Sequence, residues 1–556
     1  MVSSDRKSMS SITRANSTTA KYTAHDPERL SVSVGDISDL GVAPTRRHFS
    51  NFNIIALSFN ICNSWVAIAT SLAIAISAGG TATLIYGILL ATIAYAATGV
   101  SLAELSSCYP TAGGQYHFAS ILAPKRFSRG LSYACGSIAM FSWIALGAAA
   151  TLLATQLLLA LVMYYQPTYA PKAWHYFLVY QAINIVFLLY NLFALAKTPW
   201  VHNVGLLLTL GSFVIVTVTC LARSDKQSAE YVWATMESNT GWPAGVTFLS
   251  GFATSCFIFA GIDASLHLAE ECTEPEKTVP KALCTTVVIG FVTGFVFAIA
   301  MCYGIKDIDE LVSTAVPIYE LWRQATNSDA AATVFLVVLL IINLFVVNAV
   351  QQTSSHLIWA FGRDNGPVLS KQLAQMHHGL EVPVWSLLAN AVVIFICGCI
   401  YLASTAAFNA LINTTIILQM ISFAMPCLLL MCRGRSEKFL AKDRWFRLPG
   451  WLGWTCNATV VVFAIVEVVF FDLPTSIPTT GSSMNYTCAV LAAMALFSGI
   501  NWLLHARKHY KGPRIDLASD IVNSAEGISS SLDITTDDLS VAGSGSEGKF
   551  YNENNA

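Results

Sequence analysis

No charged side chain occurs between His48 and Glu104, and this gap constrains the fold more than any other feature of the sequence. A membrane-spanning helix needs about 20 consecutive apolar residues, so the gap is long enough for two crossings. Gly79 and Gly80 are the natural place to divide it, because glycine permits a tight reversal of the backbone. Over the whole chain 54% of residues are apolar and 12% are charged, which indicates that most of the surface faces lipid.

Long apolar runs separated by short polar breaks continue to about residue 510. They predict an all-α membrane protein with twelve transmembrane helices. The predicted spans are 54–77, 83–105, 131–162, 175–195, 201–222, 245–269, 283–304, 332–361, 384–403, 406–432, 452–472 and 486–506. Both ends of the chain are polar, so we expect disordered tails at 1–45 and 511–556 around a transmembrane domain at 46–510.

The distribution of Lys and Arg predicts the orientation in the membrane. With the N-terminus inside, the exterior loops carry only Lys172, Arg223, Lys226, Lys306 and Arg323, and most other basic residues of the loops lie inside. We therefore expect both termini in the cytoplasm and a location in the plasma membrane. The net charge of −2 gives no indication of nucleic-acid binding.

Two segments within the apolar runs predict broken helices. They are Asn60, Ile61, Cys62, Asn63, Ser64 and Trp65 in the first span, and Phe257, Ile258, Phe259, Ala260 and Gly261 in the sixth. An unwound backbone survives at membrane depth only where it is buried in protein or lines a cavity. Because the segments lie five spans apart, we expect a five-plus-five inverted repeat with broken helices 1 and 6, two peripheral helices, and substrate bound between the breaks. The alternative is that the polar side chains of the first segment only bond neighbouring helices.

Asp263 places a carboxyl group at membrane depth, where a charge is costly unless it is paired, protonated or functional. His267 follows one helical turn later and can face it. This pair is our candidate for proton coupling, and a structural pair that braces the helix end is the alternative. Glu467 in the eleventh span lies outside the predicted repeat, so we expect it to be structural or to contact a second copy.

Further polar and aromatic residues in the spans leave two interpretations open. Asn348, Gln352 and His356 repeat every four residues and form one polar face of the eighth span. This face can line a water-filled path, but packing between helices is the favoured interpretation. A protonated or quaternary amine can bind aromatic faces, for which the candidates are Trp65, Trp143, Phe257, Phe259 and Phe408.

Three segments then resemble a known family. They are LAELSSCYPTAGGQY at 102–116, DASLHLAEECTEPEKTVPKA at 263–282 and FGRDNGP at 361–367. In order and spacing they are similar to motifs of the amino acid–polyamine–organocation superfamily, over about residues 45–510. Within it the chain most resembles the fungal amino acid/choline transporter branch, which includes choline and 4-aminobutyrate permeases. Residues 63–65 and 484–486 are particularly similar to the choline permeases.

The resemblance implies the five-plus-five fold, uptake by proton symport, and substrate binding at 60–64 and 257–263. The chain departs from the family in two places. Many relatives have a glycine-rich break in the first helix, whereas 60–64 contains no glycine, which leaves room for an amine without a carboxylate. Some relatives couple protons through a lysine in the fifth helix, which is missing here, so Asp263 or His267 is our candidate for that role.

We therefore expect a secondary active transporter that imports choline, 4-aminobutyrate or a related amino acid or amine. The alternative is a nutrient sensor with a transporter fold and little transport activity. No P-loop, HExxH or GxSxG motif occurs in a suitable context, so we expect no enzymatic activity, no cofactor and no metal. The expected partners are the substrate, protons and the lipid bilayer, and Lys7 and Lys21 are candidate sites for ubiquitin-dependent trafficking.

Overall fold

The computed structural model describes residues 50–513 except 167, 196, 197, 199, 237–239, 315, 378, 475, 482 and 483. Both predicted tails, apart from residues 511–513, and the candidate ubiquitin sites Lys7 and Lys21 lie outside the described residues. Within them the secondary structure is helical, with one isolated bridge between His377 and Val382. The predicted all-α fold is therefore confirmed.

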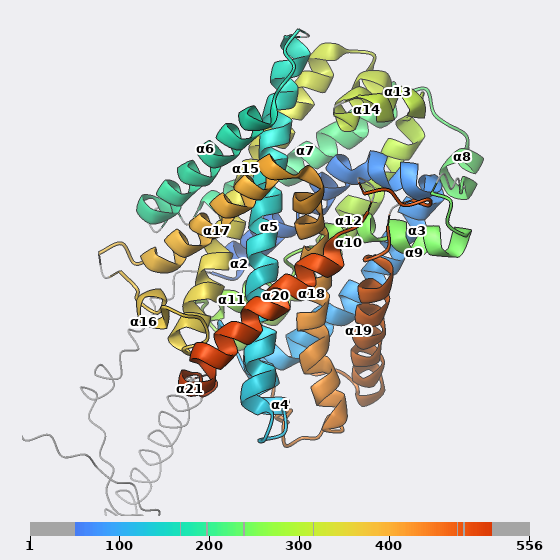
Figure 1. The fold of residues 1–556 in the computed structure, drawn as a ribbon. Coiled ribbons are helices and arrows are strands. Elements are labelled where there is room, and N and C mark those ends of the chain that lie inside the picture. Colours follow the sequence, from blue (N-terminus) through green and yellow to red (C-terminus); the bar gives the residue numbers. More distant parts are fainter. Residues whose placement is uncertain are drawn as a thin grey trace, which may run out of the picture. The chain divides into compact units, whose positions relative to one another are not determined.

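Eleven helices in the described part of the chain are long and apolar enough to cross a membrane (Figure 1). α2 (Asn51–Cys62) and the first part of α3 (Ser64–Cys108) form one, and the second part of α3 forms another. The others are α5 (Ser128–Tyr165), α6 (Ala173–Phe193), α7 (Val201–Arg223), α12 (Pro275–Gly304), α15 (Asp329–Arg363), α17 (Val384–Ala403), α18 (Thr405–Cys432), α19 (Gly450–Phe470) and α20 (Thr487–Asn501). Non-helical backbone angles at Gly79 and Gly80 divide α3 at the predicted place.

The predicted sixth span is a series of short helices. It consists of α9 (Ala244–Gly251), α10 (Ala253–Cys256), the 3₁₀-helix η2 (Phe257–Phe259), α11 (Ala264–His267) and the 3₁₀-helix η3 (Ala269–Glu271). The uninterrupted apolar part, Ala244–Phe259, is too short to cross a membrane alone. The interruption therefore occurs where the sequence predicts it, while the count of twelve spans and the inverted repeat stay predictions.

Short helices lie in the connections between the long ones. They are α4 (Gln115–Leu122), α8 (Ala229–Ala234), α13 (Ile308–Ser313), α14 (Pro317–Thr326), α16 (Ser370–Leu373), the π-helix η4 (Trp502–Ala506) and α21 (Arg507–His509). Because successive long helices run in opposite directions, the connections gather at two faces. We call the face with residues 109–127, 364–383 and 433–449 the basic face, and the face with 224–243, 305–328 and 471–486 the opposite face.

The long helices surround a buried core. α3 packs along α12, and α5 packs along both α15 and α18. In Figure 1, α5 passes behind α20, and α6, α17 and α15 lie to one side of it. α20 is peripheral, since only Thr487 and Asn501 of its residues are buried. The two interrupted segments, in contrast, are buried in the core, where an unwound backbone needs partners from the protein itself.

Candidate functional site

The first interruption consists of a single residue. Asn63 separates α2 from α3 and has left-handed backbone angles, φ 32° and ψ 59°, which asparagine tolerates better than most residues. Its side-chain oxygen accepts a hydrogen bond from the Thr209 hydroxyl at 2.8 Å, and this hydroxyl accepts one from the Trp65 indole at 2.9 Å. The break is therefore anchored to α7.

The second interruption depends on Gly261. Its φ of +77° is a conformation that side chains with a Cβ rarely adopt, and a Cβ added there would lie 2.5 Å from Cγ2 of Ile61. The Gly261 amide donates to Oε1 of Gln419 at 3.1 Å. The Ser64 hydroxyl donates to the carbonyl oxygen of Ile258 at 2.6 Å and so ties the two interruptions together. Glycine at this position allows the two broken segments to approach each other.

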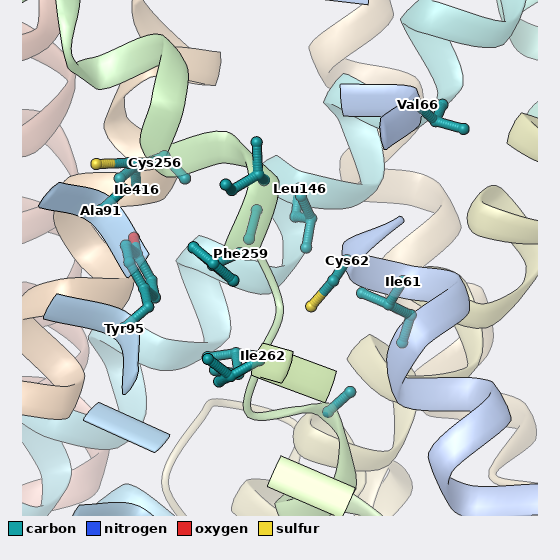
Figure 2. Packing of buried hydrophobic residues seen from close by; sticks show 14 of the residues in the cluster. Ile61, Cys62, Val66, Ala91, Tyr95, Leu146, Cys256, Phe259, Ile262 and Ile416 are labelled. Carbon is teal, nitrogen blue, oxygen red and sulfur yellow. The ribbon is translucent and has the colours of Figure 1, made fainter. Parts of the chain in front are cut away.

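A cavity of about 630 Å³ lies between the two interruptions. It reaches the segment before α20, so it opens toward the opposite face. Among the described residues its lining contains apolar and neutral polar side chains, and no Asp, Glu, Lys or Arg. The polar members are Cys62, Asn63, Thr70, Ser71, Gln156, Thr254, Asn343, Asn409, Asn413, Asn485 and Tyr486. Figure 2 shows two further lining residues, Ile61 and Leu146, with Leu146 between α2 and the segment that carries Phe259.

The predicted substrate-binding residues divide into two groups. Those that line the cavity are Ile61, Cys62, Asn63, Phe257 and Ala260. The others, Asn60, Ser64, Trp65, Ile258, Phe259 and Gly261, lie next to it and support its wall. The Trp65 ring, for example, packs on Phe297 with 5.3 Å between ring centroids. The lining residues of α18 and of the segment before α20 were not among the predicted substrate-binding residues, although neutral polar residues such as Asn409 and Asn413 inside an apolar span are a visible signal.

Asp263 lies just beyond the second interruption and is 1% exposed. One of its oxygens, Oδ2, accepts hydrogen bonds from Gln115 Nε2 at 2.6 Å and Trp143 Nε1 at 3.2 Å, and lies 3.0 Å from Nε2 of His267. The predicted contact between Asp263 and His267 is therefore present. Trp143 also touches the region of Gly261, whose added Cβ would lie 3.4 Å from the indole ring. The acid is thus linked through Trp143 to Gly261, which lies next to the cavity.

The hydrogen-bond pattern of His267 identifies an exchangeable proton. Its Nδ1 lies 3.1 Å from the carbonyl oxygen of Ala112, which can only accept, so Nδ1 carries a hydrogen. The close contact between Nε2 and Asp263 then needs a second proton between them, on one group or the other. All three groups gather at Oδ2, while Oδ1 of Asp263 is buried without a hydrogen-bond partner among the described residues.

Ion pairs lie between this cluster and the basic face. The Arg363 guanidinium binds the Glu270 carboxylate through two hydrogen bonds of 2.7 and 2.9 Å, and His356 lies 2.8 Å from Glu271. Burial raises the pKa of Glu270, but the adjacent guanidinium outweighs burial and holds that pKa below its usual range. These two pairs therefore tie the segment after Asp263 to α15.

The polar face of α15 contacts neighbouring helices. Oδ1 of Asn348 accepts from Asn191 at 3.1 Å, and Oε1 of Gln352 lies 2.9 Å from Nε2 of His202. Together with the pairing of His356 to Glu271, these contacts match the packing interpretation. The cavity is lined instead by Asn343, which lies further toward the start of α15.

Within the described residues, no group of three or more His, Cys, Asp or Glu side chains is placed to hold a metal ion.

The amino acid permease family model matches residues 49–494. The choline transporter of Saccharomyces cerevisiae is 32% identical over 86% of this chain and 85% of its own. The transmembrane transporter swnT of Metarhizium robertsii is 32% identical over 84% and 93%, and the 7-keto 8-aminopelargonic acid transporter of S. cerevisiae is 25% identical over 81% and 90%. This chain is a member of the amino acid permease family.

Proposed function

We propose that the chain is a proton symporter that imports choline, 4-aminobutyrate or a related amino compound across the plasma membrane. The observation that carries this proposal is the cavity, because residues of both helix breaks line it. Two of the similar proteins are named as transporters of choline and of 7-keto 8-aminopelargonic acid, so their names indicate substrates with an ammonium or amino group.

The chemistry of the cavity supports a cationic amine with a small polar group. α2 and η2 both end at the cavity, and the last carbonyl groups of a helix concentrate partial negative charge. Phe257 and Tyr486 add aromatic rings that can bind a quaternary or protonated amine. The side-chain amides of Asn63, Asn343 and Asn413 can bind a hydroxyl or carboxyl group at the other end of the substrate.

Asp263 and His267 are our candidates for the proton site of this cycle. The pair lies at the end of the second break, and its proton can leave only if the hydrogen bonds around Asp263 rearrange. Trp143 donates to Asp263 and touches the region of Gly261, so such a rearrangement changes the contacts at the cavity wall. This arrangement links the protonation state to the shape of the substrate site.

Uptake by yeast cells that lack their own carriers tests the proposal. Cells that display the protein are given labelled choline, 4-aminobutyrate, polyamines and amino acids, with and without a protonophore. We expect at least one amine to accumulate and the protonophore to abolish its accumulation. If no compound accumulates despite surface expression, the transporter proposal is wrong and a sensor becomes the better interpretation.

A further inference from the structure

Glu467 is a further buried acid, outside the cluster around Asp263. It lies in α19 and its side chain is 0% exposed. It therefore faces the interior of this molecule, and the expectation that it contacts a second copy is wrong. Among the described residues no nitrogen or hydroxyl group donates to its carboxyl oxygens, and its hydrogen-bonding neighbour is the Cys256 thiol, a weak donor. A charged carboxylate with so little support is very costly in such surroundings.

Two polar side chains that interact electrostatically with Glu467 connect it to the broken segment. The Cys256 thiol, which hydrogen-bonds with Glu467, is the last residue of α10 and directly precedes the broken segment. The Tyr95 hydroxyl comes from α3 and has no hydrogen-bond partner among the described residues. The Tyr95 ring stacks on Phe259 of η2, with 5.2 Å between the ring centroids and an angle of 25° between the planes. Figure 2 shows the Cys256 thiol and Tyr95 on the side of the segment away from Ile61 and Cys62.

These contacts make the surroundings of Glu467 depend on the position of the broken segment. Thr254 and Phe257, which flank Cys256 in the sequence, line the cavity. A movement of this segment therefore alters the cavity on one side and the neighbours of Glu467 on the other. α9 and α18 also pack against α19, and neither contains a charged, His or Tyr residue. α3 also carries Glu104, but that acid is paired with Arg435 and Arg444 near the basic face.

We propose that Glu467 is a second proton-binding site of the transport cycle, coupled through Tyr95 and Cys256 to the broken segment. The acid is protonated while the cavity is open to the opposite face. It releases its proton when movement of the segment brings water or hydrogen-bond donors to the carboxyl group. This inference depends on the proposed proton symport, and it assigns the site a proton as its ligand.

The test compares Glu467→Gln with Glu467→Asp in proteoliposomes of the full chain that contain a substrate identified by the uptake screen. A proton symported with each substrate lets a pH difference of about one unit sustain about tenfold accumulation. We expect the Gln variant to exchange substrate across the membrane yet to accumulate about tenfold less than the wild type. The Asp variant keeps a titratable group, so it should retain more of the accumulation than the Gln variant.

If Glu467 has only a structural role, the Gln variant should accumulate more substrate than the Asp variant. Gln has nearly the shape of Glu, whereas the shorter Asp leaves a void. Wild-type accumulation by the Gln variant, or an Asp variant no better than Gln, overturns the inference. If the Gln variant also loses substrate exchange, uptake by Tyr95→Phe is measured as a function of pH. A shift of this pH profile relative to the wild type supports the inference, and an unchanged profile overturns it. If substrate accumulation by the wild-type protein does not depend on the pH gradient, proton symport itself is wrong. This outcome is distinct from failure of the inference about Glu467.

Discussion

The two helix interruptions are held in different ways. The first is one residue long, and side chains of the neighbouring α7 secure it through the hydrogen bond from Thr209 to Asn63. The second extends from Phe257 to the start of α11 and depends on a glycine, a distant glutamine and a buried acid. The short break separates α2 from α3 by one residue, whereas the long break places Phe257 and Ala260 at the cavity and ends next to Asp263. We infer that the first break is a pivot between α2 and α3. The second break contributes to the proposed substrate site and ends next to the candidate proton site.

Gly261→Ala tests the second break most severely, and we expect the largest effect from it. The left-handed conformation costs a residue with a Cβ about 1–2 kcal/mol, and the new methyl group would collide with Ile61 and press on Leu146. Transport should be lost and the Tm of the purified protein should fall. Gly211→Ala in α7 is the matched control, since nothing lies within 4 Å of its added Cβ. Transport by Gly261→Ala at the wild-type rate would show that the two breaks need not touch.

Asp263→Asn tests whether the second break carries the proton. The amide cannot take up a proton at this position, and Glu467 would remain as the other proton site, so we expect accumulation at a pH difference of one unit to fall about tenfold while delivery to the cell surface is retained. Uptake of labelled substrate at several external pH values measures the effect. Asp443→Asn, which neutralises an exposed acid in the loop between α18 and α19, serves as the control and should behave like the wild type. Fully proton-driven uptake by the Asp263 variant would remove this acid from the mechanism.

Ser64→Ala tests the bond between the two breaks, with a smaller expected effect. The variant loses the hydrogen bond to the carbonyl of Ile258, which is worth about 1 kcal/mol. A modest fall in Tm and a change in the apparent substrate affinity should follow. Ser58→Ala removes a buried hydroxyl of α2 that has no partner among the described residues, so it should be neutral. Equal effects of the two substitutions would mean that the bond does not help to hold the breaks together.

The local features of the site were predictable from the sequence. Gly79 and Gly80 divide α3 as expected, and Asp263 meets His267 because residues four apart share one face of a helix. Partners that are distant in the chain were not predictable. Gln115 and Trp143 reach Asp263 from 148 and 120 residues away, and a single sequence gives no information about such pairs. The neutral amides of α18 were visible in the sequence, but only the packing of α18 against α5 brings them to the cavity.

The one-residue break at Asn63 has a mechanical consequence. α2 has 12 residues and is therefore about 18 Å long, so a small rotation at one residue swings its far end through several times the distance moved at the cavity. That end is fastened by Asn51, which accepts a hydrogen bond from Thr278 of α12, and by Asn53, which accepts one from Asn203 of α7. α2 can thus pivot at Asn63, next to the cavity, while hydrogen bonds hold its other end at the basic face. A swing of α2 must break these two hydrogen bonds, the bond from the Asn60 amide to the carbonyl oxygen of His202, and packing against α7 and α12.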